Sequence, residues 1–393
     1  MSDLLADTNV ALGVSGSIAA VKVVELAHEL RRHGASVRAV MTDAATGIVH
    51  PWAVEFATEH DVVTEITGRV EHVELCGREG WADVFLLAPT TANTVGKIAS
   101  AVDDTPVTTC ATTALGAGVP VVCAPAMHEP MYDHPGVLDA IDRVESWGVE
   151  FVDPRIEEGK AKIATEEAIV TATARAAGDR PLDGRHVVVT SGATSEAVDT
   201  VRVLTNRASG RTGRAVARAL AARGADVTLL HDASSVGADD VPYADVVDVE
   251  SAAEMTDAAI DACADADALV SAAAISDYTV EAAAEKIRSG QESLTIELTP
   301  TRKLLDAVRE TYPDLTLVGF KAESEGDDDD LIAQARATIE RVGLAFCVAN
   351  DASVMGEAGT RALFVASDDH TAYTGSKLGL GLRVASTLAE EFE

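Results

Sequence analysis

The stretch HVVVTSGATSEAVDTVRVLTNRASGRTGRAVARAL, residues 186–220, decides the fold. It opens on the β-branched run 187–189, which is typical of a buried strand in a parallel sheet. Two turns of small residues follow, and the second of them, 208–213, leads into an expected helix with an apolar face. Free backbone N–H groups and the helix dipole meet at such a corner, so it suits a bound phosphate. The stretch therefore predicts an α/β domain that begins in mid-chain.

The mid-chain position of this corner implies that another domain precedes it. A chain of 393 residues suits two domains of roughly 150–200 residues each. The segment 172–183 turns polar and carries glycine and proline, as a short linker does. We therefore expect one domain over 1–178 and a second over 184–393. Strands alternate with helices in both, which predicts two tandem α/β doubly wound (Rossmann-like) three-layer domains.

The first domain opens in the same way as the second. Val10–Val14 is typical of a strand, 15–17 of a turn, and Ile18–Arg32 of a helix with apolar residues at 3.6-residue spacing. Gly34 ends this helix, and 35–41 is the second expected strand. The turn has no GxGxxG pattern, so it favours the phosphate of a mononucleotide over a dinucleotide.

Two proline-bearing loops, 89–93 and 124–132, follow further expected strands at 83–88 and 120–124. Ligands of open α/β sheets bind at the carboxyl ends of the strands, which makes these loops candidates for a binding site. The second domain repeats the pattern, with strands expected at 186–191, 225–231, 267–273, 315–320 and 345–349 and a hairpin within 362–374.

The chain is strongly acidic, with 64 Asp and Glu against 31 Lys and Arg and a formal charge of -33. This charge argues against nucleic acid or an anionic membrane as partner. Because the acidic residues are dispersed, they predict a cytosol of very high salt, which screens their repulsion. Five cysteines without CxxC spacing favour reduced thiols, and the N-terminus lacks a signal peptide or membrane span. We therefore expect a cytoplasmic protein.

Several polar residues allow both a structural and a functional interpretation. His72 is either a surface or capping histidine or an acid–base group over a cofactor. His128 and His134 lack a third ligand at metal-site spacing. The acidic run 327–330 is better explained by the positive N-terminus of a helix than by a metal.

Four segments in order then carry a resemblance to a known family: SGSIAA at 15–20, the surroundings of His72, APTTANTVGKIA at 88–99 and PAMHEPMY at 125–132. They resemble the flavin-containing cysteine decarboxylases. The full length resembles the bifunctional phosphopantothenoylcysteine decarboxylases/phosphopantothenate–cysteine ligases of coenzyme A biosynthesis, in an archaeal and halophilic form.

For the first domain, the resemblance implies FMN and a decarboxylase. Oxidation of the substrate thiol by FMN supplies the electron sink that loss of CO2 requires. His72 matches the family's active-site histidine, and His128 replaces a bacterial asparagine in a substrate-binding motif. In the family, a segment that closes over the substrate carries a cysteine thought to protonate the reaction intermediate, and this chain has no cysteine there. Lys160 or Lys162 could donate that proton instead or anchor a carboxylate. A solvated basic loop explains the two lysines equally well. The FMN contacts implied are Ser15, Gly16 and Ser17 for the phosphate, and Thr42, Thr90, Thr91, Asn93 and Met127 near the ring system.

For the second domain, the resemblance implies a CTP-dependent ligase. CTP with Mg²⁺ would activate 4′-phosphopantothenate as an acyl-cytidylate, and cysteine's amine would attack it. Asn206 matches the asparagine tied to turnover of the acyl-cytidylate, and Lys286 is the cation expected at the triphosphate. Phe320 could pack on the base or lie in the core, and Asp277 could meet the nucleotide or cap a helix. The remaining nucleotide contacts implied are Ser209, Gly210 and Ala273.

The resemblance also implies self-association, with a trimer-based decarboxylase core, a dimeric ligase half and a dodecamer as one full assembly. The preference between CTP and ATP stays open. Two other functions remain as alternatives: a flavoprotein of another class, such as a prenyl-flavin synthase, and a non-catalytic regulatory homologue.

Overall fold

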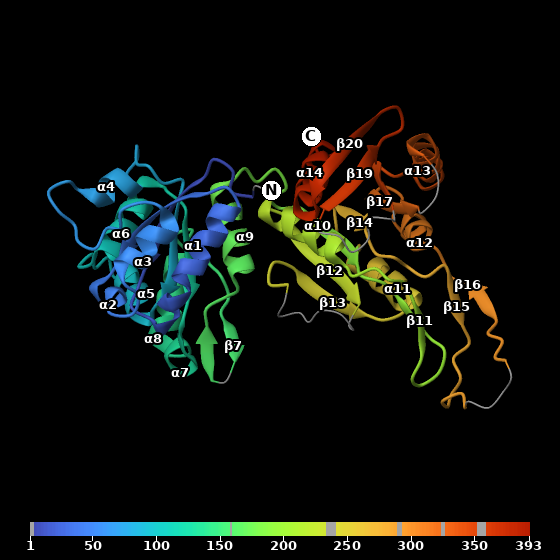
Figure 1. Cartoon of the computed structure of the whole chain (residues 1–393), viewed down its shortest axis with the longest axis horizontal. Helices are drawn as coiled ribbons and strands as arrows, with labels where there is room; N and C mark the ends of the chain where they lie inside the picture. The colour runs from blue at the N-terminus through green and yellow to red at the C-terminus, as the bar shows by residue number, and fades with distance from the viewer. Residues whose placement is uncertain (1–3, 158, 233–240, 289–292, 324–326, 352–358) are drawn as a thin grey trace. The chain divides into compact units, whose positions relative to one another are not determined.

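A computed structural model describes residues 4–393 except 158, 233–240, 289–292, 324–326 and 352–358. Glu158, within the segment that carries the two lysines, therefore lies outside the described residues. The chain divides into two compact units, the first ending at Asp179 and the second beginning at Arg180 (Figure 1). None of the described helices is both long enough and apolar enough to cross a membrane.

The first unit is built on a five-stranded parallel sheet. The strands in sheet order are β2 (Ser36–Met41), β1 (Asn9–Val14), β3 (Val84–Thr90), β4 (Val121–Pro125) and β6 (Glu150–Phe151). The two central strands β1 and β3 are nearly all buried, as expected for strands covered on both faces. A small antiparallel sheet comprises β5 (Met127–His128), β8 (Lys160–Lys162) and β7 (Arg155–Glu157).

Two groups of helices sandwich this sheet. One group is the 3₁₀ turn η1 (Ile18–Lys22), α1 (Val23–Arg32), α3 (Pro51–Thr58) and α9 (Glu166–Ala177). The other is α4 (Glu71–Cys76), α5 (Ala92–Ala99), α6 (Pro106–Ala117) and α8 (Pro135–Glu145), and the short helices α2 (Asp43–Thr46) and α7 (Glu129–Tyr132) lie in loops. The apolar side chains of α4, α5, α6 and α8 pack with those of the sheet in one core.

Several boundaries in the first unit differ from the sequence prediction, and the expected loop 124–132 contains β5 and α7. The expected helix Ile18–Arg32 begins with the 3₁₀ turn, and Ser17 caps it by accepting a hydrogen bond from Ala19 N. The expected loop at 89–93 is also much shorter, because β3 continues through Thr90 and α5 begins at Ala92. Only Thr91 connects them.

The second unit is built on an eight-stranded sheet that is parallel except at one edge. Its strands in sheet order are β13 (Asp245–Val249), β12 (Asp226–Asp232), β9 (His186–Ser191), β14 (Ala268–Ser271), β17 (Thr316–Glu323), β18 (Phe346–Asp351), β19 (Gly359–Val365) and β20 (His370–Ser376). Its helices are α10 (Arg211–Ala222), α11 (Ala252–Ala262), α12 (Leu304–Thr311), α13 (Asp328–Val342) and α14 (Lys377–Glu390). The β19–β20 hairpin confirms the one predicted within 362–374.

The acidic run at 327–330 lies at the N-terminus of α13, where the sequence analysis expected it. Asp327 accepts a hydrogen bond from Asp330 N at 3.1 Å and so caps the helix. Asp328 pairs with Arg361 of β19, which lowers the pKa of the Asp328 carboxyl. The run therefore serves the helix N-terminus.

Two short hairpins form an arm that the sequence analysis did not predict. They are β10 (Ser195–Ala197) with β11 (Val203–Thr205), and β15 (Tyr278–Val280) with β16 (Leu298–Pro300). Figure 1 shows β11, β15 and β16 extending beyond the edge of the main sheet. Strands of three residues are too short to display a clear alternation of apolar and polar residues.

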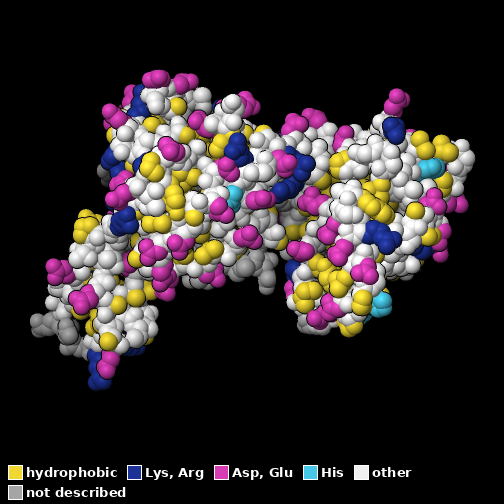
Figure 2. Space-filling view, turned by 180° about the vertical axis from the view of Figure 1, so that it is seen from behind, with side chains coloured by type: hydrophobic (Ala, Val, Ile, Leu, Met, Phe, Trp, Pro, Cys, Tyr) yellow, Lys and Arg dark blue, Asp and Glu magenta, His cyan; other side chains and the backbone are white. Residues whose placement is uncertain are grey.

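Asp and Glu side chains are scattered over the face shown in Figure 2 and gather in no single patch. This distribution agrees with the dispersed acidic residues of the sequence.

Candidate functional sites

The strand orders place one switch point in each sheet. In the first sheet, the strand that follows β1 in the chain lies on one side of the β1–β3 pair and the strand that follows β3 lies on the other side, so the switch point is between β1 and β3. In the second sheet it is between β9 and β14 for the same reason. A crevice opens at such a point beyond the carboxyl ends of the two strands, and ligands of doubly wound sheets bind there. Each unit has a pocket at this position.

The first pocket has a volume of about 580 Å³ and lies where the loops after β1 and β3 meet. Ser15 joins these two loops: its Oγ donates to Pro89 O at 2.6 Å and accepts from Thr91 N at 3.1 Å. Ser17 Oγ donates to Ala126 O, after β4, at 3.0 Å. The serines of the turn therefore hold three strand ends together beneath the pocket.

Gly16 is required by close packing at the same turn. A Cβ atom there would lie 2.5 Å from Ala44 Cβ, so any side chain would displace the backbone. Thr42 holds the facing segment: its N donates to Val14 O, and its Oγ1 accepts from Ala45 N at 3.2 Å. The turn after β1 thus packs directly on the segment that follows β2.

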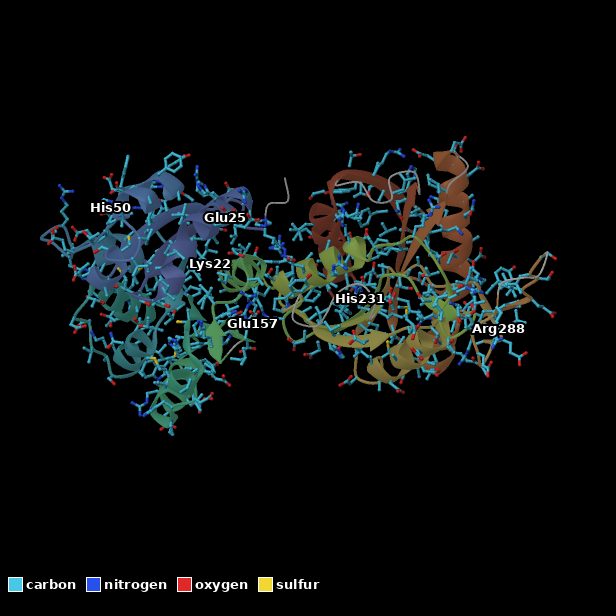
Figure 3. The ribbon with its side chains drawn as sticks, turned by 60° about the horizontal axis from the view of Figure 1, so that its bottom comes forward. Lys22, Glu25, His50, Glu157, His231 and Arg288 are labelled. Atoms are coloured by element: carbon cyan, nitrogen blue, oxygen red, sulfur yellow. The ribbon has the colours of Figure 1, made fainter. Side chains whose placement is uncertain are left out.

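One wall of the first pocket is basic. Lys22, Arg155, Lys160 and Lys162 line it, and Glu157 accepts from Lys162 Nζ at 2.8 Å and from Arg155 Nη1 at 2.9 Å (Figure 3). The hydrogen bond from Lys162 lowers the pKa of Glu157. Within the described part of the chain, Lys160 has no such carboxylate partner, so it is the lysine better able to meet a ligand's negative charge.

The structure brings only some of the residues predicted for the first site to this pocket. Thr42, directly after β2, and Thr90, the last residue of β3, are buried and outside the lining, and Asn93 is exposed on α5, also outside it. His72, on α4, is also outside the lining, and its Nδ1 is buried with no hydrogen-bond partner among the described residues. The predicted residues that do line the pocket are Gly16, Ser17, Thr91, Met127, His128, Lys160 and Lys162.

The second pocket has a volume of about 500 Å³ and lies between the ends of β9 and β14 and the start of α10. Thr190 Oγ1, at the end of β9, accepts from Ala273 N at 3.1 Å, and Asn206 Nδ2 donates to Ala274 O at 3.0 Å. The predicted residues that line it are Asn206, Ser209, Gly210, Ala273, Asp277 and Phe320.

The loop before α10 needs its glycines. Gly210 has φ +69, a left-handed conformation that favours glycine, and its carbonyl accepts from Ser191 Oγ at 2.9 Å. A Cβ at Gly213 would lie 2.5 Å from Ser191 Oγ. The first turn of α10 therefore packs directly against the end of β9, which leaves its N–H groups facing the pocket.

The second pocket is also lined by four cationic side chains that the sequence analysis missed. They are Arg207, Arg211, Lys321 and Lys377. Two of them could have been found, because Lys321 follows Gly319-Phe320 and Arg211 begins the predicted helix. Lys286, the cation that was predicted, is exposed on the arm and does not line the pocket of its own chain. Asp277 lines the pocket and is paired with Lys303.

A buried histidine supports the second pocket from below. His231, at the end of β12, is completely buried, and a Cβ at Gly210 would lie 2.6 Å from its Cε1 (Figure 3). Arg214 Nη1 lies 3.3 Å from its Nε2 and donates to Ser209 O at 3.2 Å. Burial first, and then the neighbouring Arg214, lower the pKa of His231, against the opposing charges of Asp232 and Asp248. A neutral ring can accept the hydrogen bond from Arg214, which in turn fixes the loop.

Comparison with known proteins gives consistent matches over both units. The family model described as Flavoprotein matches residues 2–178, and the one described as DNA/pantothenate metabolism flavoprotein C-terminal domain matches residues 182–391. The chain is 47% identical over 368 residues to a coenzyme A biosynthesis bifunctional protein CoaBC of Thermococcus kodakarensis, covering 93% of this chain and 90% of that protein. A CoaBC of Methanocaldococcus jannaschii is 35% identical over 354 residues, covering 90% of this chain and 85% of that one. Among solved structures, the FMN-dependent cysteine decarboxylase SpaF is 32% identical, covering 44% of this chain and 99% of that one with a TM-score of 0.40.

Proposed function

This chain belongs to the family of coenzyme A biosynthesis bifunctional proteins, and from this premise we propose that it makes 4′-phosphopantetheine in two reactions. The second unit joins 4′-phosphopantothenate to cysteine, and the first unit decarboxylates the product. The observation that carries the proposal is the pair of pockets, one at the switch point of each sheet. Five free, buried cysteines suit a cytoplasmic enzyme.

The first pocket fits FMN. The Gly16 turn lines this pocket and brings backbone N–H groups to a phosphate. The hydroxyls of Ser17 and Thr91 hold the loops around it, because Ser17 Oγ donates to Ala126 O and Thr91 Oγ1 accepts from Thr94 N. Bound FMN supplies the oxidation and re-reduction of the substrate that loss of CO2 requires. Lys160 binds the substrate's negative charge on the basic wall, and His128 lines the same wall.

His72 serves the pocket of a neighbouring copy in this proposal. Its Nδ1 is buried without a hydrogen-bond partner among the residues that the structure describes, and His72 lies outside the pocket of its own chain. Val70 and Val73, on either side of it, are 49% and 48% exposed, which favours their being covered in an assembly. This arrangement agrees with a trimer-based decarboxylase core, in which each site takes its histidine from the next subunit.

Mixing two inactive variants tests this sharing. Gly16→Val is expected to lose the flavin absorbance, because its side chain would overlap Ala44, and His72→Asn is expected to lose the acid–base group. Co-expressed in equal amounts, the two are expected to recover about a quarter of the wild-type CO2 release, since only some neighbours combine an intact turn with an intact histidine. Ligase activity of each variant alone controls for folding. A mixture as inactive as its components would place both residues in one chain's site.

The second pocket fits a nucleoside triphosphate. N–H groups at the start of α10 and the cations Arg211, Lys321 and Lys377 surround the place where phosphates would lie. Phe320 lines the pocket and offers a flat face to the cytosine ring. Mg²⁺ would bind together with the triphosphate, because it is usually held by substrate phosphates and waters with only one or two carboxylates.

Lys286 extends the phosphate site from the arm. The arm exposes the apolar residues Val203, Leu204 and Leu298, which suits a dimeric ligase half in which Lys286 meets the triphosphate held by the partner. Lys286→Gln is expected to raise the KM for CTP about tenfold, because one charge-assisted phosphate contact is lost. Steady-state pyrophosphate release measures this. Decarboxylation of supplied phosphopantothenoylcysteine should be unchanged, and an unchanged KM for CTP would remove Lys286 from the site.

A further inference from the structure

A buried carboxylate lies at the base of the arm that carries Lys286. Asp199, in the turn between β10 and β11, is only 4% exposed. Its Oδ1 accepts from Val201 N at 2.8 Å and from Arg202 N at 2.9 Å, and its Oδ2 accepts from Ile287 N at 3.0 Å. Although burial opposes ionisation, these three donors together with Arg202 lower the pKa of Asp199. The carboxylate is therefore charged and fully engaged.

Arg202 binds the same segment from its other side. Its Nη2 donates to Ile287 O at 2.8 Å, and its Nη1 lies 3.3 Å from Asp199 Oδ2. Ala283 N also donates to Val198 O at 3.1 Å. Both backbone polar groups of Ile287 are thus held by the Asp199–Arg202 pair.

Asp199 and Arg202 bind a segment that has no regular secondary structure of its own. Residues 281–288 lie between β15 and β16 and form neither helix nor strand. The N–H group that donates to Asp199 Oδ2 belongs to the peptide bond that joins Lys286 to Ile287. That peptide is fixed while the Lys286 side chain is exposed, and Figure 3 shows Arg288, two residues on, far out on the arm and away from His231.

We propose that Asp199 and Arg202 are positioning residues for Lys286: they hold the peptide that follows it, so that its ammonium is presented at one point of the ligase's triphosphate site. This inference rests on the proposed CTP-dependent ligation. A lysine on a free loop would keep its charge but would have to be ordered each time a nucleotide binds, and that loss of conformational entropy would weaken binding. The pair removes this cost before the nucleotide arrives.

A double-mutant cycle on the full-length enzyme separates positioning from general stability. In Asp199→Asn, one carboxylate oxygen becomes an NH2 group. The amide therefore cannot accept both from Val201 N and Arg202 N on one side and from Ile287 N on the other. We expect it to raise the KM for CTP about tenfold, close to the effect of Lys286→Gln, with the KM for 4′-phosphopantothenate changed less than twofold. Because Asp199 acts through Lys286, adding Asp199→Asn to Lys286→Gln should raise the KM for CTP no further.

Glu196→Gln is the matched control. Glu196 is another buried carboxylate of this arm, which accepts from Ala252 N at 2.8 Å and from Thr279 Oγ1 at 2.6 Å. Among the described residues, neither of these hydrogen bonds involves the segment 285–288. Any effect of Glu196→Gln should therefore be the same with and without Lys286. Arg202→Lys, which keeps the charge but loses the donation to Ile287 O, replaces Asp199→Asn in the cycle if the latter does not fold.

Two outcomes would overturn the positioning role. One is an Asp199→Asn enzyme with an unchanged KM for CTP. The other is an increase that is equally large in the Lys286→Gln background, which would make Asp199 a purely structural residue. Failure of the proposed function is distinguishable, because then the wild-type enzyme itself would release no pyrophosphate from CTP in the presence of both substrates.

Discussion

Replacing His72 with asparagine is expected to reduce CO2 release at least a hundredfold while leaving pyrophosphate release from CTP unchanged. A positioned acid–base group typically contributes 10²–10⁴-fold to a rate, and asparagine cannot take up or release a proton at the position of Nδ1. The enzyme should then accumulate phosphopantothenoylcysteine, which mass spectrometry distinguishes from the decarboxylated product by the mass of CO2.

The structure explains why this variant should still fold. Nδ1 of His72 has no hydrogen-bond partner among the described residues, so its removal breaks no hydrogen bond with them. His50→Asn is a suitable control, because His50 is another histidine of the first unit and caps α3, accepting from Trp52 N at 3.2 Å (Figure 3). Asparagine is itself a good helix cap, so CO2 release should be retained. Unchanged CO2 release in His72→Asn would exclude His72 from the reaction.

Replacing Asn206 with aspartate is expected to reduce ligation at least a hundredfold. The amide lines the second pocket and is held there by donation from Nδ2 to Ala274 O at 3.0 Å. Loss of one preorganised donor at a reacting carbonyl costs about 10²–10³-fold in rate. The aspartate would also place a negative charge beside the carbonyl oxygen of Ala274 and near the nucleotide phosphates.

Single-turnover kinetics can locate the blocked step. If Asn206 acts on the acyl-cytidylate, the variant should still release about one pyrophosphate per site and then stop before cysteine is joined. Decarboxylation of added phosphopantothenoylcysteine should proceed normally, which shows that the protein is folded. Ligation at the wild-type rate would contradict the assignment, and absence of the pyrophosphate burst would move the role of Asn206 to nucleotide binding.

The regular strands of both sheets could be predicted because each is a short apolar run between turn residues. The run that became β9 was predicted at the bounds that the structure shows, 186–191. β13 was missed: its sequence DVVDV has only three apolar residues, two of which, Val246 and Val247, are not buried at the sheet edge. The arm was missed because its four strands have only three residues each, too few to display a clear alternation of apolar and polar residues.

Sequence alone determined the two α/β units, their strand–turn–helix corners and the residues that form them, because local apolar periodicity and glycine placement are written in consecutive positions. Only the tertiary structure decided which distant residues meet. It joined Ser15 to Thr91 and Asn206 to Ala274, added Lys321 and Lys377 to the second pocket, and left His72 and Lys286 outside the pockets of their own chain. The physical reason is that strand order and the path of the arm depend on contacts between residues far apart in the chain, and such contacts leave no periodic signal in the sequence.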